Sequence, residues 1–178
     1  MSHYPALRVS DLSQNSPTPF DLTPDSDSLS ALATELDLLD LRKLRFSGEI
    51  KAQGKQDWRL KAKLGATVTQ PCVVSLEPVT TRIDLWIERT FLTNWDTPED
   101  SEVEMSEDDT IEPLGTEIDV AAIMAESLAL NLPLYPRKEG VALGESVHAE
   151  PGVKPLTDED TKPFAGLAAL KDALNKDK

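Results

Sequence analysis

The stretch WRLKAKLGATV at residues 58–68 decides the fold. Apolar residues occupy every second position of this stretch, and Arg59, Lys61, Lys63 and Thr67 stand between them. Successive side chains of a strand point to opposite faces, so this period of two predicts a strand with one apolar and one basic face. Residues 44–52 repeat the alternation, and the turn at residues 54–56 separates the two runs. The sequence therefore predicts a long antiparallel hairpin whose apolar side chains share one face.

Further strands are expected on either side of this hairpin. Residues 79–92 continue the period of two, with Ile83, Leu85 and Ile87 on the apolar side. The same pattern places Trp86 on the polar side, an exception among charged neighbours. A short edge strand is also predicted at residues 6–10, followed by a link rich in Pro, Asp and Ser at residues 13–27.

Two helices are predicted to cover the apolar face. Leucines at helical spacing indicate a helix over residues 28–40, which the Ser and Asp residues at 26–28 can cap. A second apolar helix is expected over residues 116–131, beginning at a capping box that opens on Thr116 and ending before Pro133. The predicted class is α+β: an antiparallel sheet of four or more strands, open or partly closed into a barrel, packed against two main helices.

The charge of the chain divides it into segments. Residues 1–137 are predicted to form one α+β domain, interrupted at 93–115 by a flexible loop in which nine acidic residues stand without Lys or Arg. Residues 138–160 have the composition of a polar linker. Residues 161–178 are predicted to form a short C-terminal helix with an apolar stripe that includes Phe164, Leu167 and Leu170. This stripe is a candidate partner-binding surface.

Composition restricts the class of protein. A net charge of −14, a single cysteine, and the lack of an apolar run of membrane-spanning length favour a cytoplasmic chain without a membrane or DNA partner. We expect a monomer. The motifs of nucleotide-binding, hydrolase and zinc-protease sites are missing, so no catalytic residue, cofactor or metal is predicted.

The basic residues are concentrated in the predicted hairpin. Residues 42–63 carry a net charge of +6, which leaves −20 for the rest of the chain. The candidate contacts to RNA phosphate on the exposed face are Arg45, Lys51, Arg59, Lys61 and Lys63. The alternative is that this face is polar only because it meets water. Aromatic side chains for base stacking are absent from the hairpin's basic face, which argues against sequence-specific reading of single strands.

Two further residues have simple structural interpretations. Cys72 stands between Pro71 and Pro78 at the end of the hairpin, among apolar neighbours that would raise the pKa of its thiol. A buried structural cysteine is therefore favoured over a catalytic thiol. Glu126, in the second helix, is most simply a solvent-facing residue.

Five segments, taken in order, resemble the YceD family, also called the large ribosomal RNA subunit accumulation proteins. They are LRKLRFSG (41–48), QPCVVSLEPV (70–79), IDVAAIMAE (118–126), LPLYP (132–136) and KPFAGLAALK (162–171). Cys72 and Pro78 belong to the family signature. Many members carry a C-x-x-C pair at this block, but here the pair is Cys72 and Ser75, and one cysteine without histidine cannot complete a tetrahedral metal site.

The resemblance implies a bacterial cytoplasmic protein needed for accumulation of large-subunit ribosomal RNA, and so for biogenesis of that subunit. It implies no catalytic residues. We expect a noncatalytic factor that contacts ribosomal RNA or a large-subunit ribosomal protein. The alternative is a protein-only adaptor, in which the acidic loop or the C-terminal helix binds a basic ribosomal protein.

Overall fold

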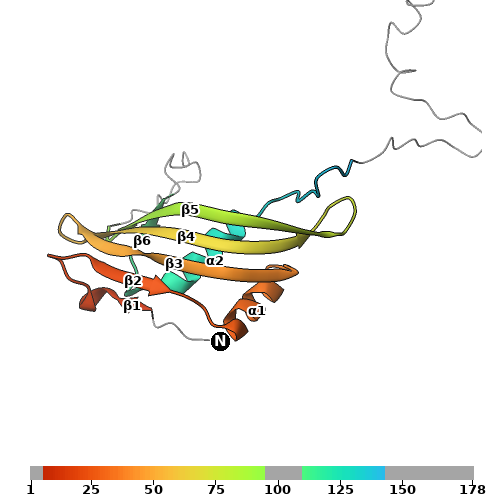
Figure 1. Ribbon diagram of the computed structural model, residues 1–178. Coiled ribbons are helices and arrows are strands. Elements are labelled where there is room, and N and C mark those ends of the chain that lie inside the picture. Colours follow the sequence, from red (N-terminus) through yellow and green to blue (C-terminus); the bar gives the residue numbers. More distant parts are fainter. Residues whose placement is uncertain (1–5, 95–109, 143–178) are drawn as a thin grey trace, which may run out of the picture. The chain divides into compact units, whose positions relative to one another are not determined.

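Three long strands make the frame of the molecule in the computed structural model, which describes residues 6–94 and 110–142 (Figure 1). They are β3 (Asp40–Gln53), β4 (Asp57–Pro71) and β5 (Pro78–Leu92), and each follows the last through a tight turn. The remaining elements are β1 (Leu7–Arg8), a 3-10 turn (Val9–Asp11), β2 (Thr18–Leu22), α1 (Ser26–Glu35), β6 (Ile111–Pro113), β7 (Glu117–Ile118) and α2 (Val120–Leu130).

The main sheet has five strands in the order β2-β3-β4-β5-β6. Its first four strands are antiparallel neighbours, whereas β6 lies parallel to β5. The sheet is therefore mixed. Parallel neighbours need a long connection, and residues 93–110 provide it. The part of the chain that the structure describes contains no pairing between β2 and β6, so the partly closed barrel is wrong and the sheet is open.

The hairpin register confirms the predicted alternation. Phe46 lies opposite Leu64 and Ile50 opposite Leu60, while Lys51 lies opposite Arg59 on the other face. The expected third strand also forms: β5 pairs along the whole of β4, from Pro71 opposite Pro78 to Trp58 opposite Phe91. Its apolar residues continue the same face.

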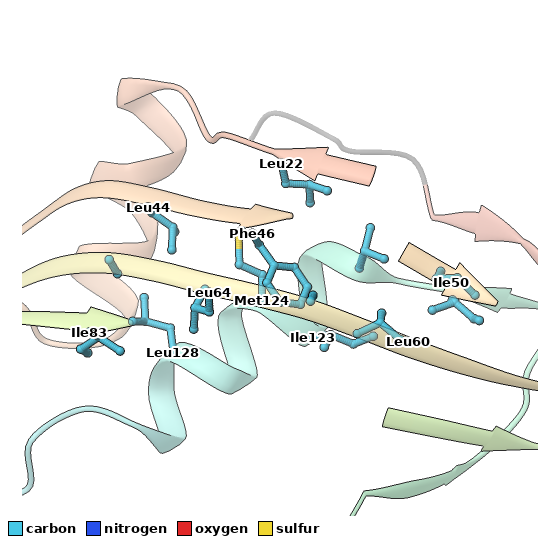
Figure 2. Close-up of a cluster of buried hydrophobic side chains, with 14 of the residues drawn as sticks. Leu22, Leu44, Phe46, Ile50, Leu60, Leu64, Ile83, Ile123, Met124 and Leu128 are labelled. Carbon is cyan, nitrogen blue, oxygen red and sulfur yellow. The ribbon is translucent and has the colours of Figure 1, made fainter. Parts of the chain in front are cut away.

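The core lies between this apolar face and the helices. Figure 2 shows Ile123, Met124 and Leu128 of α2 among strand side chains that include Phe46, Leu60 and Leu64. Phe46, Leu60, Leu64 and Leu128 are fully buried. Replacing a buried leucine of this kind with alanine costs about 2–5 kcal/mol, so the apolar stripe of β4 is essential to the fold.

Both helices are shorter than predicted. Helix α1 spans Ser26–Glu35 because Asp25, not a residue at 26–28, accepts the backbone N–H of Ser28, and because the chain turns left-handed at Asp37 (φ 53°). Helix α2 spans Val120–Leu130. Its cap is Asp119, whose carboxylate accepts two N–H groups, and the residues before it form β7 instead of a helical turn.

Two strands appear where links were predicted. Strand β2 lies inside the Pro, Asp and Ser-rich link, where Pro19 is tolerated because an edge strand has one unpaired side. Strand β6 lies inside the expected acidic loop 93–115, of which residues 95–109 are outside the described residues. The predicted short strand near the start forms as β1, but it pairs with β7 and not with the main sheet.

The chain divides into two units, Met1–Glu139 and Gly140–Lys178. All the elements named above belong to the first unit. The predicted linker 138–160 lies largely outside the described residues, and the predicted helix 161–178 lies wholly outside them. In the parts described, no helix is both long and apolar enough to cross a membrane.

Candidate functional site: the polar face and the cysteine corner

The exposed face of the β3-β4-β5 sheet brings together all five predicted RNA contacts. Residues that lie opposite each other in a ladder point to the same side, and the pairs Arg45 with Gly65, Lys51 with Arg59, and Lys61 with Glu88 fix this side as the polar one. We use the name polar face for the following residues in the central part of this side: Asp21, Arg45, Ser47, Glu49, Lys51, Arg59, Lys61, Lys63, Gly65, Arg82, Asp84, Trp86 and Glu88.

Carboxylates on neighbouring strands neutralise much of this positive charge. Arg45 forms a two-pronged ion pair with Asp21 of β2, at 2.6 Å for its closer oxygen. Glu88 of β5 accepts both Arg59 and Lys61. Among these residues six cations stand beside four carboxylates, so the set carries a net charge of +2.

The pKa values of two carboxylates reflect this pairing. The hydrogen bonds from Arg45 hold the pKa of Asp21 below its usual value. Arg82 does the same to the pKa of Asp84, to which Lys63 adds a smaller attraction. These acids therefore stay ionised, and they compete with any phosphate for their partner guanidinium groups.

Lys51 and Lys63 differ from the other cations of the polar face. Both side chains are exposed, and within residues 6–94 and 110–142 neither forms an ion pair. An ammonium group without a carboxylate partner can bind phosphate without first breaking a contact. Within the predicted set, these two lysines are thus the ones that no carboxylate of the described residues holds in an ion pair.

Two hollows mark the polar face near these lysines. The larger, of about 410 Å³, is lined by Glu49, Lys51, Ala52, Gln53, Arg59 and Lys61. The smaller, of about 190 Å³, is lined by Arg45, Ser47, Lys63, Gly65, Arg82 and Asp84. A Cβ at Gly65 would lie 2.5 Å from the Nη2 atom of Arg82, so a larger residue there would displace the end of that side chain. The Arg82–Asp84 pair fills the space that a side chain would take.

An aromatic side chain also belongs to the polar face. Trp86 lies directly opposite Lys63 and is 79% exposed. Strands β3 and β4 themselves carry no aromatic on this side, as predicted for the hairpin. The register of β5, on whose polar side the sequence placed Trp86, carries the indole to the same face.

The turn between β4 and β5 forms a second distinctive structure, which we call the cysteine corner (residues 70–79). Its backbone closes through bonds from Cys72 N to Glu77 O and from Leu76 N to Cys72 O, with Leu76 in the left-handed region at φ 60°. Pro71 and Pro78 face each other where the ladder ends. As predicted, the Cys72 side chain is fully buried.

The thiol of Cys72 is more acidic than predicted. Hydrogen bonding from the Ser75 side chain, and from the backbone N–H groups of Lys138, Ser75 and Val74, lowers the pKa of Cys72 to about 6 despite its burial. The N–H groups of Ser75 and Lys138 each lie 3.4 Å from the sulfur. The prediction of a raised pKa is wrong because these donors come from the turn backbone and from a residue far along the chain.

The cysteine corner is joined to the segment that leaves α2. Val73 donates its N–H to the carbonyl of Pro136, Gln70 donates its side-chain amide to the carbonyl of Pro133, and Lys138 pairs with Glu77 at 2.9 Å. Two segments that resemble the family, 70–79 and 132–136, are thus in direct contact. Exposed apolar side chains surround this junction, namely Val73, Leu76, Leu134 and Tyr135.

One ion-pair group on the helical side of the sheet was not predicted. Arg89 of β5 is only 15% exposed and pairs with Glu112 of β6 at 2.9 Å and with Glu126 of α2 at 3.6 Å. Glu126 is exposed, as expected, but it also ties α2 to the sheet. The sequence signal was an arginine at an apolar position of the β5 alternation.

The remaining predicted site residues, Phe164, Leu167 and Leu170, lie outside the described residues. Among those described, no group of three or more His, Cys, Asp or Glu side chains is arranged to hold a metal ion.

Comparison with known proteins gives one match. The family model described as large ribosomal RNA subunit accumulation protein YceD matches residues 60–171, which is more than half of the chain. The match includes the cysteine corner, β5, α2 and the 162–171 segment, whereas residues 41–48 precede it. Neither the curated proteins nor the solved structures contain a match. The extent of the family match shows that this chain belongs to the YceD family of large ribosomal RNA subunit accumulation proteins.

Proposed function

We propose that this protein is a noncatalytic factor that supports accumulation of large-subunit ribosomal RNA by contacting that RNA through the polar face. The observation that carries the proposal is the pair of exposed lysines, Lys51 and Lys63, which have no ion-pair partner among the described residues and stand beside shallow hollows. The family description supports RNA as the partner.

The balance of charge favours a selective contact over a general affinity for polyanions. The chain as a whole carries −14, so it repels nucleic acid except where the polar face is presented. A net charge of about +2 on that face gives a weak, salt-sensitive attraction. Such a factor would work in the cytoplasm, as a monomer, without a cofactor.

The experiment is RNA binding measured as a function of salt, with a large-subunit ribosomal RNA fragment. The slope of log K against log salt is negative, and each lost phosphate contact reduces its magnitude by about 0.7–0.9. Lys51→Gln combined with Lys63→Gln should therefore reduce that magnitude by roughly 1.5. Arg8→Gln combined with Arg137→Gln makes the same change of net charge away from the polar face and should leave the slope unchanged. An equal slope for all three proteins would rule out the polar face as the phosphate contact.

A second comparison separates free from paired cations. Arg45 is already engaged by Asp21, and Arg59 shares Glu88 with Lys61, so neither is free to bind phosphate in the way that Lys63 is. We expect Arg45→Gln and Arg59→Gln each to weaken binding less than Lys63→Gln does.

The protein-only adaptor remains the rival function. It relies on the acidic loop and the C-terminal helix, which lie mainly outside the described residues. If nuclease treatment leaves the association with ribosomal particles intact and deletion of residues 161–178 destroys it, the adaptor is correct and the RNA proposal is wrong.

A further inference from the structure

Trp86 exposes a large apolar side chain on the polar face, among charged neighbours. It is 79% exposed on β5, and its neighbours along the strand on the same face are Asp84 and Glu88. The other large apolar side chains that are exposed in the described residues lie in turns, in α2 or in the segments that flank the helices: Leu39, Val73, Leu76, Leu130, Leu134 and Tyr135. Among them, Trp86 alone stands within the main sheet.

The surroundings of Trp86 match the two parts of a nucleotide. Lys63 lies directly opposite it in the ladder, and neighbouring strands are about 4.8 Å apart, so one nucleotide can reach both side chains. An indole offers a flat surface on which a base can stack, and the Lys63 ammonium, which forms no ion pair within the described residues, offers a contact for phosphate. The hollow lined by Lys63, Gly65 and Arg82 adjoins this position.

The carboxylates beside Trp86 restrict how a nucleotide can lie. Asp84 and Glu88 precede and follow the indole on the same face of β5, and both repel phosphate. A backbone that ran along β5 would meet these charges. A backbone that crosses from β5 towards β4 meets Lys63 instead, which leaves the base over the indole.

The base must be unpaired for this contact to form. Bases in a duplex are stacked on one another and cannot lie on a side chain without being opened, whereas those of loops and single strands stack freely on aromatic residues. We propose that Trp86 is a stacking platform for an unpaired base of single-stranded RNA, and that Lys63 binds the adjoining phosphate. This inference rests on the proposed function and names the kind of RNA that the polar face receives.

The test compares binding of oligouridylate with binding of an RNA hairpin duplex. Trp86→Ala should weaken binding of the single strand by roughly five- to a hundredfold, without changing the salt slope, and should leave duplex binding unchanged. Trp86→Phe should retain much of the affinity, because phenylalanine also stacks. Tyr135→Ala removes an aromatic of similar exposure from the segment that leaves α2 and should have no effect.

Fluorescence provides a direct readout of the contact. Trp58 is buried, so in a Trp95→Phe background the indole that solvent and RNA can reach within the described residues is Trp86. Oligouridylate should quench its emission, and Trp86→Ala should abolish that quenching.

The outcomes separate this inference from the proposed function. If Trp86→Ala binds the single strand as the parent does, while Lys51→Gln with Lys63→Gln weakens binding, the stacking inference is wrong and the RNA contact stands. If neither variant changes binding, both are wrong. If Trp86→Ala leaves RNA binding intact but loses a ribosomal protein, Trp86 belongs to a protein interface and the stacking inference is overturned.

Discussion

The acidity of Cys72 is set by groups that its own neighbourhood in the sequence does not show. Valines and a proline flank it, and these suggest a raised pKa. The structure surrounds its sulfur with N–H donors from the turn and from Lys138, and these lower the pKa of Cys72 to about 6. Hydrogen bonds to the thiolate thus outweigh the cost of burying it.

The acidity of Cys72 predicts how stability depends on pH. The native thiol loses its proton near pH 6, whereas the cysteine of the unfolded chain does so at about pH 8.5. Between these two values the unfolded chain therefore binds more protons than the native one. The contribution that the Cys72 thiolate makes to stability should therefore rise with pH across this window, reach its full size above it, and vanish below pH 6, while the packing of the buried side chain is unaffected by pH. Urea unfolding of the parent and of Cys72→Ala at a series of pH values measures the difference. Thiolate absorbance that titrates near pH 8.5 in the folded protein would contradict this account.

Two glycines of the hairpin should differ sharply in their tolerance of alanine. A Cβ on Gly48 would strike the backbone carbonyl of Lys61 and lie 2.6 Å from the Cα of Ala62, and neither atom can move without disturbing the ladder. We expect Gly48→Ala to cost about 2–3 kcal/mol of unfolding free energy.

Gly65→Ala is the matched comparison. Its Cβ would meet the mobile end of Arg82, which can swing away, and alanine restricts the unfolded chain more than glycine does. The net cost should stay below about 1 kcal/mol. Chemical denaturation of both variants checks the contrast, and equal losses would mean that the close approach at Gly48 is relieved elsewhere.

At the scale of elements, the long strands could be predicted, whereas of the short strands only β1 was expected, and its partner β7 was not. A period of two over residues 58–68 has few alternatives, because a slip of the register by one residue would expose the apolar set. Strand β2 gives a weaker signal, since Pro19 and its polar neighbours resemble a loop, and the strand forms because β3 offers it an unpaired edge. Strands β1, β6 and β7 have two or three residues each and depend on partners distant in the sequence.

The start of α2 offers a direct test of the capping assignment. Asp119 accepts N–H groups from Ala121 and Ala122, both at 3.0 Å, whereas Thr116 precedes β7. Asp119→Ala should therefore lower the unfolding free energy by about 1 kcal/mol. Thr116→Ala, which the sequence pattern alone would mark as the cap, should change it by less than about 0.5 kcal/mol. A larger loss for Thr116→Ala would place the cap where the sequence placed it.

At the scale of the whole molecule, the surfaces depend on which strands and segments become neighbours. All five basic residues predicted as RNA contacts do share a face, because one strand pair carries them. Asp21 of β2 and Glu88 of β5 neutralise part of the charge of these basic residues, and β5 also places Trp86 on their face. The sequence of the hairpin cannot specify the registers of these two strands. The contact between the cysteine corner and the exit of α2 likewise joins residues more than sixty positions apart.

The family match and the polar face together predict a direct contact with large-subunit ribosomal RNA in the cell. Ultraviolet crosslinking in growing cells, followed by sequencing of the attached RNA, tests this contact most directly. We predict that the parent protein crosslinks to large-subunit ribosomal RNA or its precursor, that Lys51→Gln with Lys63→Gln loses most of that signal, and that Arg8→Gln with Arg137→Gln keeps it. Crosslinks to ribosomal proteins alone, or a signal that survives the loss of both lysines, would contradict the account.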